Sequence, residues 1–133
     1  MEISYLLDTN ICIFLLRGNL QIKDKILECG ISNCNISEIT FAELLYGAYC
    51  SSDKDKNIEL VKNLCSLFKI IPISDCLEDF VIQKTELRKK GLLIDDFDLL
   101  IGATAMAYNL KLITDNIRHF QRLPIEIENW VER

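Results

Sequence analysis

Residues 5–10, YLLDTN, decide the fold, because they join a short apolar run to the start of a helix. Residues 3–7 are apolar enough for a buried central strand. Asp8 and the two residues after it are types that begin turns and cap helices. The apolar residues 11–16 then end at Arg17-Gly18, as a helix does. A carboxylate is thus predicted at the carboxyl end of a buried strand, where ligands collect in open α/β sheets; alternatively, Asp8 only caps the helix.

The length and composition predict one globular domain spanning residues 1–133. The chain has 133 residues, of which 50% are apolar, so it can bury a core without disulfides. It shows no apolar run of the ~18 residues that a membrane helix needs. It also lacks the basic and apolar regions of a secretory leader. We therefore expect a cytoplasmic protein that does not bind membranes.

The cysteines and the charge narrow the class further. None of the six cysteines forms a Cys-x-x-Cys pair, which disfavours a zinc knuckle or a redox dithiol. Most lie in apolar stretches and are predicted to be small core residues. With 15 basic and 20 acidic residues, the net charge is −5, so general affinity for nucleic acid is not expected. RNA or DNA would have to be bound through a local basic patch or through cations.

Strands and helices alternate along the chain, which predicts an α/β fold with a mostly parallel sheet of about five strands wrapped by helices. Further strands are expected at residues 33–36, 69–73, 111–113 and 125–127. Further helices are expected at residues 20–29, 37–49, 57–68, 74–90 and 95–108. The last of these is almost wholly apolar or small after its acidic start, so it is predicted to be buried on all sides.

Four acids lie at strand exits, at a helix start or among apolar helix residues. Asp8 and Asp115 each follow a predicted strand, Asp98 begins the buried helix, and Glu43 lies between apolar neighbours. Each also has a purely structural interpretation. Glu43 can close a capping box with Thr40, and Asp98 can close one with Asp95. Asp115 can be a turn residue.

If these acids converge, they need a counter-charge. Two like charges ~5 Å apart repel by about 3 kcal/mol at an effective dielectric near 20, so a cluster requires a divalent cation or shared protons. Oxygen ligands suit Mg²⁺ or Mn²⁺ better than zinc. Such ions activate water and clamp a phosphate in phosphodiester hydrolysis.

Other chemistries lack the residues they need. His119 is the only histidine, which excludes a two-histidine ribonuclease mechanism, and we expect it in a surface turn. The sequence contains no Gly-x-Ser-x-Gly elbow, no phosphate-binding P-loop and no Gly-x-Gly-x-x-Gly turn.

Four sequence blocks resemble those of a known family. Residues 6–10 (LLDTN), 36–44 (ISEITFAEL) and 98–103 (DLLIGA) resemble the motifs of PIN-domain proteins, at the spacing of VapC toxins from toxin–antitoxin pairs. Residues 113–120 (ITDNIRHF), with the segment up to Trp130, are similar to the VapC branch that cleaves initiator tRNA. The resemblance covers essentially the whole chain.

The resemblance implies an α/β/α sandwich and an endoribonuclease that depends on Mg²⁺ or Mn²⁺. It places Asp8, Glu43 and Asp98 on the family's acidic triad, with Asp8 and Asp98 as metal ligands. It also implies a homodimer, a VapB-type antitoxin as partner, and a tRNA substrate cut in the anticodon stem-loop of the initiator tRNA.

The chain departs from the family at the fourth acid. The family pattern Thr-x-Asp would place an acid at position 116, where this chain has Asn116, one residue after Asp115. Either Asp115 substitutes as a catalytic acid, or Asn116 acts as a neutral ligand. His119 also stands where the family has an acid.

Supporting roles follow from the same resemblance. Thr9 and Thr114 match positions whose hydroxyl groups orient the acids or water, and Asn10 and Asn116 match positions that support them. Apart from the resemblance, basic side chains expected near the mouth of the site are candidate RNA-binding residues: Arg17, Arg118 and Arg122, which could equally form a solvated face.

Two other classes remain open on the sequence alone. A non-catalytic PIN-like module that binds RNA or protein would retain RNA without turnover or metal dependence. A receiver-like phosphotransfer domain would have paired acids directly after the first strand and a lysine after a later one, an arrangement that this sequence supplies poorly.

Overall fold

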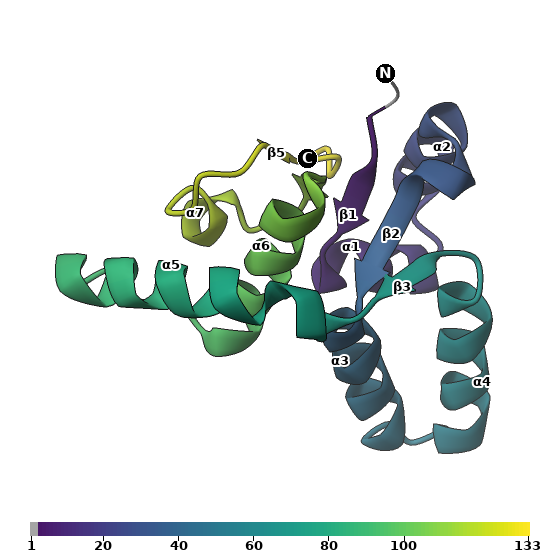
Figure 1. Ribbon diagram of the computed structural model, residues 1–133. Helices are drawn as coiled ribbons and strands as arrows, with labels where there is room; N and C mark the ends of the chain where they lie inside the picture. The colour runs from purple at the N-terminus through teal and green to yellow at the C-terminus, as the bar shows by residue number, and fades with distance from the viewer. Residues whose placement is uncertain (1–2) are drawn as a thin grey trace.

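A parallel sheet forms the centre of the computed structural model, which describes residues 3–133 (Figure 1). The sheet has five strands in the order β3-β2-β1-β4-β5, and every neighbouring pair is parallel. The strands are β1 Tyr5–Leu7, β2 Cys34–Ser37, β3 Lys69–Ile71, β4 Lys111–Ile113 and β5 Ile127–Glu128. The predicted α/β fold with a mostly parallel sheet is confirmed.

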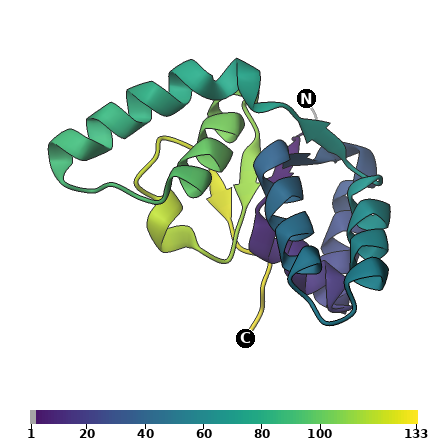
Figure 2. The same ribbon diagram turned by 90° about the horizontal axis from the view of Figure 1, so that it is seen from below.

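Helices cover both faces of the sheet, because successive side chains of its central strands point to opposite faces. Leu7 and Ile113 belong to one buried cluster, whereas Leu6 and Leu112 belong to another. Figure 2 shows α5 and α6 together on one side and α3 and α4 together on the other. The helices are α1 Thr9–Leu16, α2 Leu20–Cys29, α3 Glu38–Tyr49, α4 Lys54–Cys65, α5 Leu77–Lys90, α6 Asp96–Tyr108 and α7 Ile117–Phe120, with 3-10 turns η1 Ile31–Asn33 and η2 Ile73–Cys76.

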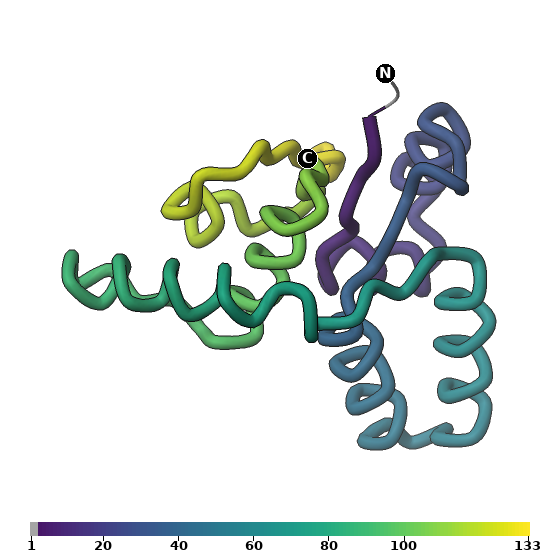
Figure 3. Tube along the Cα trace, viewed as in Figure 1, coloured from purple at the N-terminus to yellow at the C-terminus, as the bar shows by residue number. Residues whose placement is uncertain are grey.

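The helix α5 extends beyond the other helices while it packs against α6 along one side (Figure 3). The trace in Figure 3 shows it as a straight rod that extends away from the pair formed by α3 and α4. It ends at Gly91, whose φ of 69° is a left-handed conformation that glycine adopts without strain. The chain then returns to begin α6, which packs against α5.

Several predicted boundaries were wrong. The helix expected at residues 57–68 begins and ends earlier, as α4, because the charged residues 54–56 form its first exposed turn and residues 66–68 turn into β3. The strand expected at 69–73 ends at Ile71, and η2 occupies the place expected for the start of α5. The short helix α7 was not predicted, and β5 begins two residues later than expected.

Other predictions on the core are confirmed. Four of the cysteines are buried, whereas Cys29 is intermediate and Cys50 is exposed. The helix α6 buries most of its central residues. Among residues 3–133, no helix has the length and apolar character needed to span a membrane; the cytoplasmic location stays a prediction.

Candidate active site

The sheet order creates a crevice beside β1. From β1 the chain adds β2 and then β3 on one side, and later adds β4 and β5 on the other. The connections therefore diverge between β1 and β4, and ligands of open α/β sheets bind outside the carboxyl ends of the strands at such a point. Asp8 leaves β1 there, and its backbone N–H extends the ladder by donating to Ile113 O at 2.9 Å.

Asp8 is a buried carboxylate with two donors. Its side chain caps α1, with Oδ1 accepting from Thr9 N at 2.8 Å, and Oδ2 accepts from Thr114 Oγ1 at 2.7 Å. Only 4% of Asp8 is exposed. Burial raises its pKa to about 6 despite these hydrogen bonds, and the charges of Asp98 and Glu43 raise it further. Capping and contact with the other acids thus coexist in one side chain.

Thr9 connects the first strand exit to α3. Its Oγ1 lies 2.7 Å from Glu43 Oε1, to which it donates, and 3.0 Å from Thr40 Oγ1. Burial raises the pKa of Glu43, and the charge of Asp98 acts in the same direction. The alternative that Glu43 closes a capping box with Thr40 is wrong, because Ser37 is the N-cap of α3 and Thr40 lies inside the helix.

Asp98 lies in the first turn of α6, opposite α7. Burial raises its pKa and the charge of Asp95 does so too, whereas the neighbouring His119 side chain lowers it. The His119 Nδ1 atom is 3.6 Å from Asp98 Oδ2 and 2.9 Å from Asn116 Nδ2. His119 was expected in a surface turn, but it lies in α7 with its ring half-exposed beside this acid. No sequence pattern pairs these two residues, so this contact was missed.

Asp115 has its own binding partners, Arg133 and Asn129. Arg133 forms a two-pronged ion pair with its carboxylate, with N–O distances of 2.8 and 2.5 Å. Asn129 Nδ2 donates to it at 3.0 Å. The Arg133 hydrogen bond lowers the pKa of Asp115. The Asp115 N–H donates to Asn10 Oδ1 at 3.4 Å, and Asn116 N donates to Thr114 Oγ1 at 2.9 Å. The side chains of Asn10 and Thr114 therefore stabilise the turn after β4.

The three candidate RNA-binding arginines have different surroundings. Arg17 lines a pocket that Glu43 also lines. Arg118 is exposed on α7. The Nη1 atom of Arg122 donates to the carbonyl oxygens of Leu92 and Leu93, at 3.1 and 3.3 Å. Arg122 therefore secures the loop before α6, whereas Arg17 and Arg118 are exposed.

The donor set of this crevice fits a hard divalent cation. Among the ion pairs of residues 3–133, none involves Asp8 or Glu43, so their charges lack a protein counter-ion. Within the same residues, no group of three or more His, Cys, Asp or Glu side chains is arranged to hold a metal by itself. Mg²⁺ normally takes one or two carboxylates and keeps several waters, which matches a site built on Asp8 and Asp98.

Comparison with known proteins identifies the class that this sheet and its acidic edge define. The sequence pattern of the PIN domain matches residues 5–126. Ribonuclease VapC2 from Rickettsia felis is 38% identical over 130 residues, which are 95% of this chain and 97% of that protein. The tRNA(fMet)-specific endonuclease VapC from Salmonella typhimurium is 31% identical over 96% of this chain and 98% of that protein.

The solved structures agree with these relatives. The crystal structure of DNA-bound VapBC from Salmonella typhimurium superposes with a TM-score of 0.91 at 30% identity, covering 97% of this chain and 99% of that one. The chain therefore belongs to the VapC branch of the PIN-domain family, and the resemblance found in its sequence is confirmed.

Proposed function

We propose that this chain is a metal-dependent endoribonuclease that cleaves tRNA, with the anticodon stem-loop of initiator tRNA as its target. Its place in the VapC branch makes it a ribonuclease toxin of a toxin–antitoxin pair. The finer parts of the proposal are its metal dependence, its substrate and the residues that act.

The observation that carries the proposal is the mutual electrostatic influence of three carboxylates near the crevice beside β1. Asp8, Glu43 and Asp98 come from three different parts of the chain, yet the charges of Asp98 and Glu43 raise the pKa of Asp8. A fold that only needed helix caps would have no reason to place these charges together. Perturbed carboxylates at a sheet switch point are typical of active sites.

Each residue has a distinct proposed role. Asp8 and Asp98 would hold the cation, with Thr114 fixing the orientation of the Asp8 carboxylate. When bound, Mg²⁺ or Mn²⁺ supplies activation of water and neutralisation of phosphate charge. Glu43, held by Thr9, would orient the water for in-line attack and accept its proton. The products would carry a 3′-hydroxyl and a 5′-phosphate.

The fourth acidic position is part of the proposal. Asp115 could join the catalytic acids only if its carboxylate left Arg133, whereas Asn116 contacts His119 beside Asp98. The amide of Asn116 is therefore better placed to act as a neutral partner of the site.

Names of related proteins support the substrate and the partner. The Salmonella typhimurium relative is named for initiator tRNA, tRNA(fMet), and the matching structure from that organism is a VapBC assembly. We therefore propose a VapB-type antitoxin as the partner that neutralises this chain. A homodimer and a single PIN domain over residues 1–133 complete the proposal.

The test uses the purified, folded chain with a bulk tRNA pool in Mg²⁺, in Mn²⁺ and in EDTA, beside an Asp98→Asn variant. Discrete fragments that require metal and vanish in the variant are expected, and mapping of their ends identifies the target. Retention of RNA without fragments in either metal would favour the non-catalytic binding module. Fragments that persist in EDTA or in the variant would overturn the assigned site.

A further inference from the structure

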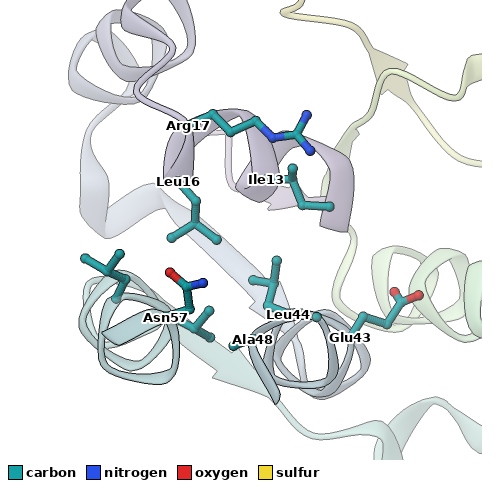
Figure 4. Close-up of a pocket in the computed structure, with 10 residues that line it drawn as sticks. Ile13, Leu16, Arg17, Glu43, Leu44, Ala48 and Asn57 are labelled. Atoms are coloured by element: carbon teal, nitrogen blue, oxygen red, sulfur yellow. The ribbon is translucent and has the colours of Figure 1, made fainter. Parts of the chain in front are cut away.

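A pocket opens directly beside the proposed active site. Its volume is about 370 Å³, and it lies between α1, α3 and α4. Figure 4 shows Glu43 at one end, Arg17 above and Asn57 on the opposite helix. Cavities of roughly 300–1,000 Å³ bind small organic groups in proteins. The pocket thus shares Glu43 with the acids but extends away from them.

The pocket combines apolar walls with three polar side chains, those of Glu43, Arg17 and Asn57. Ile13, Leu16 and Leu44 supply aliphatic walls. No hydrogen bond or ion pair among residues 3–133 engages the Arg17 guanidinium. Asn57 donates from Nδ2 to Ser51 Oγ at 2.8 Å, which fixes its amide and leaves its carbonyl oxygen as an acceptor. A flat, apolar group that carries an N–H on its edge matches these surroundings.

We propose that this pocket binds one unstacked nucleobase of the RNA, from a nucleotide next to the scissile phosphate. Proteins that read single-stranded RNA hold splayed bases between side chains and bond to their edges, often with an Arg guanidinium on the ring face. Here the aliphatic walls enclose the ring, Arg17 lies over it and Asn57 accepts from its edge. This inference rests on the proposed ribonuclease function and adds a specificity site to it.

Continuity with the acids favours a base over an apolar protein side chain. The residue that ends the pocket, Glu43, is itself held by Thr9 in the acid cluster. A nucleotide whose phosphate reaches Asp8 and Asp98 therefore has its base within reach of this cavity. A purely apolar side chain would leave the Asn57 carbonyl without a partner as it dried the pocket.

Gly47 offers a way to fill the pocket without disturbing the fold. It lines the cavity, and a Cβ atom added there would meet nothing within 4 Å. Gly47→Leu should therefore project a side chain into the proposed base site, whereas Gly47→Ala changes the same helix position and leaves most of the space open.

The experiment combines this pair with the removal of single bases. A stem-loop RNA containing the mapped cleavage site is made with one abasic ribose at a time, and kcat/KM is measured for the unsubstituted chain, Gly47→Ala and Gly47→Leu. At one position beside the cut, loss of the base should lower kcat/KM by about 5- to 150-fold, the range of one stacked base. Gly47→Leu should cause a similar loss on intact RNA, and the two changes together should cost no more than either alone.

A second variant guards against an indirect effect of the leucine. Asn57→Leu removes the carbonyl acceptor, and it should reduce cleavage of intact RNA while leaving cleavage of the same abasic RNA unchanged. Circular dichroism and thermal unfolding confirm that each variant is folded.

The outcomes separate the two proposals. If the unsubstituted chain cleaves no RNA, the proposed function fails. If it cleaves RNA but Gly47→Leu matches Gly47→Ala on every substrate, or the losses multiply at all abasic positions, only the base pocket is overturned. Normal cleavage by Gly47→Leu with lost binding of the purified antitoxin would assign the pocket to a protein partner instead.

Discussion

At the residue scale, Asp8 is in an unfavourable electrostatic environment. Two hydrogen bonds stabilise its ionised form, yet burial and the neighbouring acids raise its pKa to about 6. At neutral pH the chain therefore keeps a buried charge that its own side chains do not neutralise. Sites of this kind commonly trade stability for function.

Replacing Asp8 by Asn should abolish cleavage and stabilise the fold. The pKa rise of about two units corresponds to roughly 3 kcal/mol between the two protonation states. The hydrogen bond from Thr114 to the Asn side chain is weaker than its bond to the ionised carboxylate, and this offsets part of the gain. We therefore expect the free energy of unfolding to rise by about 1–3 kcal/mol at pH 7 in EDTA. Urea unfolding measures it, and a loss of stability would contradict this view of Asp8.

The same pKa gives a pH dependence with a definite sign. The native chain holds the Asp8 proton more tightly than the unfolded chain, whose Asp pKa is near 3.9. The free energy that Asp8 contributes to stability is therefore present at low pH and is lost as the pH rises to about 6. The stability gap between Asp8→Asn and the unsubstituted chain should widen from pH 4 to pH 6 and stay level above it.

Asp115 should matter less to cleavage than Asp98 does. Arg133 and Asn129 already bind its carboxylate, so Asp115→Asn is expected to lower kcat only a few-fold, whereas Asp98→Asn removes activity. Single-turnover cleavage of tRNA compares the two variants. An equal loss in both would make Asp115 the fourth catalytic acid.

The sequence could nominate the candidate acidic residues of the site, but it could not predict which side chains contact their carboxylates. Asp8, Glu43 and Asp98 stand out by local context and family resemblance. The bond from Thr114 to Asp8 joins residues 106 positions apart, and only the order of strands in the sheet brings them together. The contact of His119 with Asp98 depends on α7, a helix of four residues that is too short to show a periodic pattern.

At the scale of elements, two glycines inside helices should respond in opposite ways to alanine. At Gly47 in α3 a Cβ meets open space, so Gly47→Ala should stabilise the chain by about 0.5–1 kcal/mol through helix propensity. At Gly102 in α6 a Cβ would lie 2.3 Å from Leu123 Cδ1. The buried Leu123 must move, so Gly102→Ala should destabilise by about 1–2 kcal/mol. Thermal unfolding of both variants tests the contrast.

Element boundaries show where periodicity is a poor guide. The strand β4 and the helix α2 were predicted well because apolar runs and capping residues agree there, whereas β1 begins at Tyr5, two residues later than expected. The helix α4 begins with charged, exposed residues. These residues bury no apolar surface, so no apolar pattern marks the start of the helix. The positions of the 3-10 turn η2 and the short helix α7 depend on packing between distant segments rather than on local preference.

At the scale of the whole molecule, the charge of −5 must shape RNA binding. If Arg118 is the main phosphate contact and Arg17 stacks on the base, the affinity of Asp8→Asn for a tRNA stem-loop in constant Mg²⁺ should fall with salt with a log–log slope of about −0.7. Arg118→Gln should make the slope shallower by about 0.7. A slope beyond about −4 would reveal a basic surface outside these residues.

The order of the sheet also sets when activity can arise during synthesis. The partner of Asp8 at the site, Thr114, follows β4, and β4 lies beside the first strand of the chain. A nascent chain on the ribosome therefore carries Asp8 and Glu43 long before it can close the crevice around them. The cell is exposed to a working nuclease only once synthesis has passed β4, which leaves time for a partner to be present.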